Sequence, residues 1–253
     1  MNLQPYLDFA TSLVYNAGKI TLRYFNTGVR TELKENNDPV TIADREAEAY
    51  IRGEIERTYP GHAIVGEEYG ENGNGHSFRW IIDPIDGTIS FIRGVPLYGV
   101  LVGLEVDGIV RVGAAYFPPL DEMLCAADGS GCLWNGRRAR VSQVDRLSDA
   151  CVVSSDFQHL TAKMPDVVDR FRNKKSLMRT WADAYGYLLV ATGRAEVALK
   201  WHWIRVWMCM IADPILSSFA RRVGTSARGA AKKVIRMGRE SPVMPPSSLR
   251  CWS

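Results

Sequence analysis

The segment from Trp80 to Thr88 constrains the fold of this chain most strongly, because it joins an apolar run directly to an acidic turn. Its apolar beginning predicts the end of a buried strand. Pro84 cannot donate a hydrogen bond to a neighbouring strand, so we expect the backbone to leave the sheet there. Asp83 and Asp86 flank this exit, and the irregular turn leaves the carbonyl of Ile85 available to a ligand.

This turn offers the oxygen ligands that hard divalent cations prefer, namely carboxylates, a backbone carbonyl and water. Gly87 lets the backbone approach a ligand closely, and Thr88 begins a predicted helix whose free N–H groups attract phosphate. A plainer interpretation is that Asp-Pro and Asp-Gly only form a turn and that Thr88 caps the helix. The acidic pair Glu67-Glu68, which follows a short apolar strand upstream, favours the metal site over that interpretation.

The run Gly66-Glu67-Glu68 and the segment 80–88 together resemble the first signature of the inositol monophosphatase-like family, whose members are magnesium-dependent phosphomonoesterases. The continuation from Phe91 to Gly99 fits the same family. The resemblance implies a five-layer αβαβα sandwich, with two or three Mg²⁺ ions between its two sub-regions. The order of the elements by itself indicates only a layered α/β or α+β fold.

The metal ligands that this resemblance implies come from both segments. Glu67 would bind one ion, Asp83 would bridge two, the Ile85 carbonyl would bind one of these and Asp86 the other. The implied reaction is hydrolysis of a phosphomonoester by water that the ions activate, without a covalent phospho-enzyme. Glu67 and Thr88 would orient this water and accept its proton.

Other residues complete the predicted site. The amides of Gly87 and Thr88 would bind the phosphate oxygens of the substrate. Thr41-x-x-Asp44 fits a helix capping box, with Thr41 at the N-cap and Asp44 at N3. The resemblance gives Asp44 a further catalytic role, as a support for the ligands or as a ligand of a third ion, with Lys34 on a loop nearby that helps to bind substrate. The two roles of Asp44 are compatible.

Residues 179–196 point to a particular substrate, because they resemble the histidinol-phosphate phosphatase branch of the family. In that branch this turn and helix line the substrate pocket. Asp183 would suit a cationic group, since histidinol phosphate carries an ammonium and an imidazole that inositol phosphate lacks; the alternative is that Asp183 caps the helix. Arg179 either contacts the substrate or supports the loop. Histidinol phosphate is therefore the predicted substrate and inositol 1-phosphate the alternative.

Periodicity and turn residues predict helices first, then an antiparallel meander, then alternating elements in a single domain over 1–253. The predicted helices are 5–27, with Gly28 as C-cap, 41–59, 161–173 and 182–193. The predicted strands are 63–65, 97–106, 109–117, 122–127, 131–134 and 151–154. Asp107-Gly108 predicts a tight hairpin turn. Residues 31–39 are expected to form a polar loop and 70–75 a mobile one.

The resemblance holds from about residue 5 to 199 and weakens after that. The family's second signature, Trp-Asp-x-Ala near a proline, should supply another metal carboxylate. The corresponding stretch here runs from Val206 to Leu216, with Met208 where Asp is expected. A thioether does not replace a carboxylate on Mg²⁺, so a catalytically impaired family member is a further hypothesis.

The atypical part of the chain also differs in charge. Residues 1–199 carry 21 Lys and Arg against 26 Asp and Glu, whereas residues 200–253 carry 10 against 2. One hypothesis is a change of reading frame: residues 223–253, back-translated with GC-rich codons and read two bases later, resemble the C-terminal strand and helix of the family. The other is a basic tail that binds nucleic acid or another polyanion. The tail has no organised motif, so we expect no nucleic-acid partner.

Composition bounds the setting of the protein. No apolar run reaches the length of a membrane span, and the N-terminus lacks a signal-peptide pattern, so we expect a cytoplasmic protein with no membrane partner. The five cysteines include no Cys-x-x-Cys spacing, which argues against a disulfide framework and a zinc site. The resemblance implies a homodimer, although no pattern in the chain indicates one.

Overall fold

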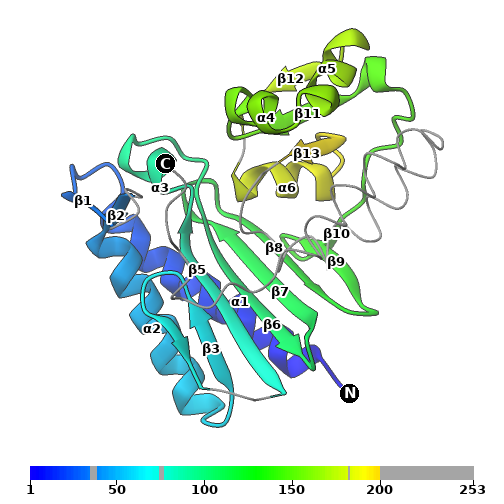
Figure 1. The fold of residues 1–253 in the computed structure, drawn as a ribbon. Coiled ribbons are helices and arrows are strands. Elements are labelled where there is room, and N and C mark those ends of the chain that lie inside the picture. The colour runs from blue at the N-terminus through cyan, green and yellow to red at the C-terminus, as the bar shows by residue number, and fades with distance from the viewer. Residues whose placement is uncertain (35–38, 74–76, 182, 200–253) are drawn as a thin grey trace.

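The computed structural model describes residues 1–34, 39–73, 77–181 and 183–199. Within these residues helices and sheets alternate in five layers (Figure 1). Two long helices cover one face of an eight-stranded sheet, and one helix lies between that sheet and a three-stranded sheet. Two further helices cover the outer face of the small sheet. The predicted αβαβα sandwich is confirmed; residues 200–253, with Met208 and the reading-frame hypothesis, lie outside the described residues.

The helices and strands have the following bounds. The helices are α1 Gln4–Leu22, α2 Ile42–Thr58, α3 Thr88–Ile92, α4 Phe157–Lys163, α5 Pro165–Asn173 and α6 Ala184–Ala191. The first strands are β1 Thr31–Leu33, β2 Pro39–Thr41, β3 Ala63–Gly66, β4 Gly70–Asn72, β5 Phe78–Asp86, β6 Gly99–Val106 and β7 Ile109–Phe117. The later strands are β8 Glu122–Ala127, β9 Gly131–Trp134, β10 Arg137–Arg138, β11 Cys151–Ser154, β12 Leu177–Arg179 and β13 Val197–Leu199.

The large sheet has the strand order β10-β9-β8-β7-β6-β5-β3-β4, in which β3 and β5 are parallel and the other neighbours antiparallel. The register pairs Gly66 of β3 with Ile82 of β5. Glu67 comes directly after Gly66, and Asp83 comes directly after Ile82. The two acidic residues therefore follow a paired position of two neighbouring parallel strands. The small sheet, β12-β11-β13, is parallel throughout.

The first core lies between the large sheet and the two helices α1 and α2. Leu13, Ile51 and Trp80 are almost completely buried there, and burying each such side chain stabilises the fold by about 1.5–3 kcal/mol. At Gly18, α1 lies close against β7, since a Cβ placed on this residue would lie only 2.5 Å from Cδ1 of Tyr116. The helix can therefore lie directly on the strand only with glycine at this position.

Helix α6 forms the middle layer. All its residues, Ala184–Ala191, are buried, and the core that they form includes Phe117 and Leu124 of the large sheet and Val153 of the small sheet. A helix that is apolar on every side needs such an enclosed position. The third core packs α4 and α5 against the other face of the small sheet.

Two predicted helices differ from those in the structure. The N-terminal helix ends at Leu22 instead of near residue 27, and turns separate it from Gly28, the expected C-cap. The predicted helix 161–173 is divided into α4 and α5, because Pro165 lacks the N–H that an unbroken helix requires and instead begins α5. The predicted helix 182–193 is α6, with slightly narrower bounds.

Three segments that were expected to lie outside a sheet form strands. The predicted loop 31–39 contains β1 and the start of β2, which pair as a short hairpin. The predicted loop 70–75 contributes β4 at the edge of the large sheet. Strand β5 does not end at Pro84 but continues to Asp86; its pairing with β6 is irregular between Asp83 and Asp86, so the missing N–H of Pro84 is tolerated.

The described part of the chain bears on the expectations about membrane spans and cysteines. None of the helices there is long and apolar enough to cross a membrane. The three cysteines in those residues, Cys125, Cys132 and Cys151, carry free thiols.

Candidate active site

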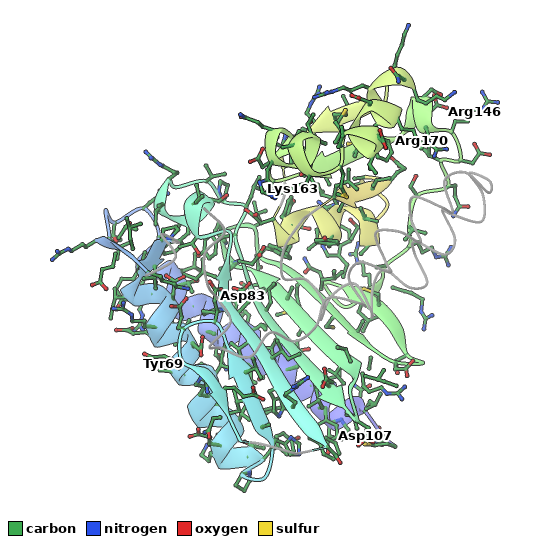
Figure 2. All side chains as sticks on the ribbon, in the orientation of Figure 1. Tyr69, Asp83, Asp107, Arg146, Lys163 and Arg170 are labelled. Carbon is green, nitrogen blue, oxygen red and sulfur yellow. The ribbon has the colours of Figure 1, made fainter. Side chains whose placement is uncertain are left out.

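The turn between β5 and α3 has the local structure that its sequence predicts. Gly87 has a φ of 95°, a left-handed conformation that favours glycine, and forms the N-cap of α3. Thr88 begins the helix and its hydroxyl donates a hydrogen bond to the Ile85 carbonyl at 3.1 Å. Asp83 lies toward the α3 end of the large sheet, while Asp107 lies at the opposite end (Figure 2). The turn thus brings together the predicted carbonyl ligand and the predicted catalytic hydroxyl.

A second contact joins this turn to helix α6. Asp86 is buried, and its Oδ2 accepts a hydrogen bond from the backbone N–H of Ala184. A Cβ placed on Gly87 would lie 3.2 Å from Oδ2 of Asp183, so these two residues are close neighbours. We call Asp86, Gly87, Asp183 and Ala184 the crossing cluster, because it joins residues from opposite halves of the chain.

Asp183 occupies the N-cap position of α6, but its side chain does not cap the helix. The carboxylate of Asp86 accepts the Ala184 N–H instead. The capping alternative for Asp183 is therefore wrong, and its carboxylate lies beside the predicted phosphate-binding residue Gly87.

The predicted residue Lys34 lies on the acidic pair that follows β3. Its Nζ donates hydrogen bonds to Oε1 of Glu67 at 2.8 Å and to Oε1 of Glu68 at 2.7 Å. The Glu67 side chain is 42% exposed, whereas that of Glu68 is only 5% exposed. Burial disfavours a charge on Lys34, but the hydrogen bonds and charges of the two carboxylates outweigh it and raise the pKa of Lys34.

Two buried carboxyl groups, Glu68 and Asp44, have raised pKa values. Burial raises the pKa of Glu68 to about 7, opposed by Lys34 and reinforced by the charges of Glu67 and Asp44. Burial also raises the pKa of Asp44 to about 6, opposed by hydrogen bonds from Thr41 and reinforced by Glu67. We call Lys34, Asp44, Glu67 and Glu68 the lysine cluster.

The structure confirms the capping box at the start of α2. The Thr41 hydroxyl donates to Oδ2 of Asp44 at 2.6 Å, the Thr41 N–H donates to the same oxygen at 2.8 Å, and the Ala43 N–H donates to the Thr41 hydroxyl at 3.1 Å. Because Asp44 also contributes to the electrostatics of Glu67 and Glu68, the cap and the site share one residue.

The donor chemistry of the two clusters fits Mg²⁺, since carboxylates and a backbone carbonyl are the oxygen donors that this ion prefers. Buried carboxyl groups with raised pKa values, as Asp44 and Glu68 have, also form an environment that a divalent cation stabilises. Among the described residues, however, no three His, Cys, Asp or Glu side chains are close enough to hold one ion. In this arrangement Lys34 binds the carboxylates of Glu67 and Glu68.

Arg179, another predicted substrate residue, belongs to neither cluster and makes a contact with its own neighbour in the chain. It is exposed at the end of β12, on the edge of the small sheet, and its guanidinium donates to the carbonyl of Met178 at 2.8 Å. This contact agrees with the loop-supporting alternative for Arg179.

Sequence reasoning missed two residues that bear on the site. Glu48 and Arg52 of α2 contact the backbone that follows Glu67. A signal was present, because Glu48 is four residues after Asp44, on the same face of the helix, and four before Arg52. In the sequence alone, this spacing equally indicates an ion pair on a solvent-exposed face of the helix. The contacts of Glu48 and Arg52 with the backbone after Glu67 are seen only in the structure.

The αβαβα sandwich, with acidic residues after β3 and in β5 beside the start of α3, agrees with the architecture that the predicted phosphomonoesterase family implies. Residues 2–215 match the sequence profile of the Inositol monophosphatase family. The chain belongs to this family, as its signature residues predict.

Individual relatives agree with this assignment. The chain is 43% identical over 216 residues to a Histidinol-phosphatase of Chlorobaculum parvum, covering 85% of this chain and 83% of the relative. It is 32% identical over 232 residues to a Histidinol-phosphatase of Mycobacterium tuberculosis, covering 89% and 88%. Among solved structures, an IMPase of Thermotoga maritima superimposes with a TM-score of 0.76 at 26% identity, covering 93% of this chain and 98% of that one.

Proposed function

We propose that this chain hydrolyses histidinol phosphate to histidinol and phosphate. The observation that carries the proposal is the position of Asp183, whose carboxylate lies beside Gly87 in the turn that would hold the phosphate. A substrate with a phosphate at one end and cationic groups at the other suits this pair. The names of two relatives, both histidinol-phosphatases, support the same choice.

The residues of the chain would divide the work as follows. The amides of Gly87 and Thr88 bind the phosphate oxygens, and the left-handed Gly87 permits that close approach. The Thr88 hydroxyl and the Glu67 carboxylate orient the attacking water, and Glu67 accepts its proton. Lys34 donates to Glu67 and offsets the negative charge of that carboxylate.

Mg²⁺ would be held by Glu67, Asp83, the Ile85 carbonyl and Asp86, with Asp44 close enough to Glu67 for their charges to interact. When bound, Mg²⁺ ions supply positive charge that lowers the pKa of water and stabilises the phosphate and the leaving group. The site recognises phosphate, so the choice of ester depends on the residues around it, with Asp183 as the selecting carboxylate and Arg179 as the support of its loop.

The proposal is tested by phosphate release from histidinol phosphate and from inositol 1-phosphate in parallel, with Mg²⁺ and with EDTA. Mg²⁺-dependent release that favours histidinol phosphate is the expected result. A preference for inositol 1-phosphate keeps the chemistry and overturns the substrate. Release from neither ester by folded protein supports the impaired family member instead.

Asp183→Asn sharpens this test, because it removes the selecting charge and keeps the shape of the side chain. We expect kcat/KM for histidinol phosphate to fall by roughly 10- to 100-fold, the range of one charged contact. The value for inositol 1-phosphate should change little. An equal fall for both esters would mean that Asp183 does not select the cationic group.

A further inference from the structure

Glu48 of α2 is a completely buried carboxylate that contacts the backbone on both sides of the predicted metal and catalytic residue Glu67. A buried charge requires hydrogen-bond partners, and two of those of Glu48 are backbone N–H groups of the segment after Glu67. Its Oε2 accepts the N–H of Glu68 at 2.7 Å, and its Oε1 accepts the N–H of Tyr69 at 3.1 Å. A helix side chain therefore binds two consecutive amides of the segment that carries Glu67.

Arg52, one turn further along α2, completes this arrangement. Its Nε donates to Oε1 of Glu48 at 2.8 Å, and its Nη2 donates to the carbonyl of Gly70. The Arg52 side chain is only 11% exposed, so solvent screens this pair less than a surface ion pair. Tyr69 lies beside α2 (Figure 2), with its ring 5.9 Å from the Arg52 guanidinium. Three consecutive residues, 68–70, are thus bound by the Glu48–Arg52 pair.

Gly66 shows how closely the backbone lies on this pair. A Cβ placed on Gly66 would overlap the Glu48 carboxylate and would lie 2.8 Å from Nη2 of Arg52. Only a residue without a side chain can occupy this position while the pair is in place. Glu67 therefore lies between a residue that is fixed by contact with Glu48 and a residue that is fixed by a hydrogen bond to Glu48.

We propose that Glu48 and Arg52 are positioning residues that hold the backbone of Glu67 where its carboxylate serves the metal site. This inference rests on the proposed function and deepens it, because it assigns to α2 the support of a ligand on another element. Supporting groups behind a metal ligand commonly change metal affinity by 10- to 100-fold when they are removed.

Glu48→Gln separates positioning from general stabilisation. Gln keeps the length of the side chain but has one acceptor oxygen and one NH₂ group, so one backbone N–H would face a donor. Arg52 would also lose its charged partner. A purely structural pair predicts a lower Tm alone, whereas a positioning pair also predicts weaker binding of a cation by protein that is still folded.

The experiment measures Mn²⁺ binding by electron paramagnetic resonance, well below the Tm of each protein. We expect Glu48→Gln to raise the Kd for Mn²⁺ by about 10- to 100-fold. Hydrogen exchange at the Glu68 and Tyr69 amides should become faster in the same variant. The matched control is Glu54→Gln, which makes the same change of charge on α2 at a residue paired with Arg57 near the surface; its Kd and exchange should equal those of the wild type.

Gly66→Ala is a second variant, which displaces the backbone without changing a charge and should also weaken Mn²⁺ binding. If Glu48→Gln does not fold, Arg52→Lys replaces it, since Lys keeps the charge but loses the fork that reaches both Glu48 and Gly70. An unchanged Kd with faster exchange overturns the positioning role. Wild-type protein that binds Mn²⁺ but releases no phosphate contradicts the proposed function alone. If the wild-type protein binds no Mn²⁺, this result contradicts both the proposed metal site and the positioning role.

Discussion

The two acidic clusters of the site differ in the partners that bind their carboxylates. In the lysine cluster the ammonium group of Lys34 offsets Glu67 and Glu68, and all members come from residues 34–68. In the crossing cluster Asp86 is satisfied by a backbone N–H that lies 98 residues away in the sequence. The first cluster needs only the N-terminal layers, whereas the second exists only when α6 is packed between the two sheets.

This difference indicates which part of the predicted activity each layer controls. The lysine cluster and the Glu48–Arg52 pair concern cation binding, because they surround Glu67. The crossing cluster concerns substrate choice through Asp183 and the docking of α6 through Ala184, and it reaches the cation site through the proposed ligand Asp86. Changes in the lysine cluster should therefore leave the substrate preference intact, whereas a change at Asp86 should affect cation binding as well.

The largest effect on activity is expected from Asp86→Asn, which changes a residue of the crossing cluster. The variant loses a proposed cation ligand and the charged acceptor of the Ala184 N–H. We expect kcat/KM for histidinol phosphate to fall by roughly 100- to 1,000-fold, and the free energy of unfolding in urea to fall by about 1–3 kcal/mol. Asp128→Asn, which changes an exposed acid paired with Arg111, is the control. Loss of activity with no loss of stability would show that the contact with α6 does not hold the layers together.

A smaller and opposite effect is expected in the lysine cluster. Lys34→Met removes the ammonium that binds Glu67 and Glu68, so their carboxylates become more available to a cation. We expect the Kd for Mn²⁺ to fall roughly fivefold, the effect of one partly solvated ion pair, as measured by electron paramagnetic resonance. Lys163→Met, at the end of α4, should leave it unchanged. Weaker binding would mean instead that Lys34 organises the carboxylates.

The smallest effect concerns a contact that joins α6 to the large sheet without touching either cluster. Oε2 of Glu122 on β8 accepts from Arg194 at 2.6 Å, and its Oε1 accepts from the hydroxyl of Tyr185 on α6 at 2.9 Å. Burial disfavours the charge of Glu122, but these donors outweigh it and hold the pKa of Glu122 below its usual value.

The sign of the pH dependence follows from that lowered pKa. The stabilisation by Glu122 is fully present above the pKa of an unfolded glutamate, about 4.3, and is lost as the pH falls through the lower folded value. We expect Glu122→Gln to lower the free energy of unfolding by about 0.5–1 kcal/mol at pH 7, a value that allows for the partial exposure of Arg194. The difference from the wild type should shrink toward pH 3 in urea titrations. A difference that grew on acidification would contradict this origin of the effect.

The elements that sequence alone predicts are those with purely local causes. Asp107 and Gly108 both have positive φ, 50° and 78°, as the predicted hairpin turn requires. The capping box of Thr41 and Asp44 formed, and strand β8 has its predicted bounds. In each case neighbouring residues in the sequence determine the conformation.

The remaining features depend on contacts that the sequence does not display. Pro84 was expected to end a strand, yet the irregular pairing of β5 with β6 accommodates it. The acceptor role of Asp86 toward Ala184 depends on the packing of α6, and no local pattern encodes it. Glu48 shows the same limit, because its partners outside α2 are the backbone amides of Glu68 and Tyr69, a group that every residue except proline carries.

The enclosed position of α6 has a consequence for how the chain folds during its synthesis. Synthesis proceeds from the N-terminus, so α1, α2 and the first strands of the large sheet emerge long before residues 184–191. Until α6 is released and docked, Asp86 lacks its Ala184 partner and Asp183 is distant from Gly87. We therefore expect the carboxylates around Glu67 to come together first, and the proposed selecting residue Asp183 to reach Gly87 only when α6 docks.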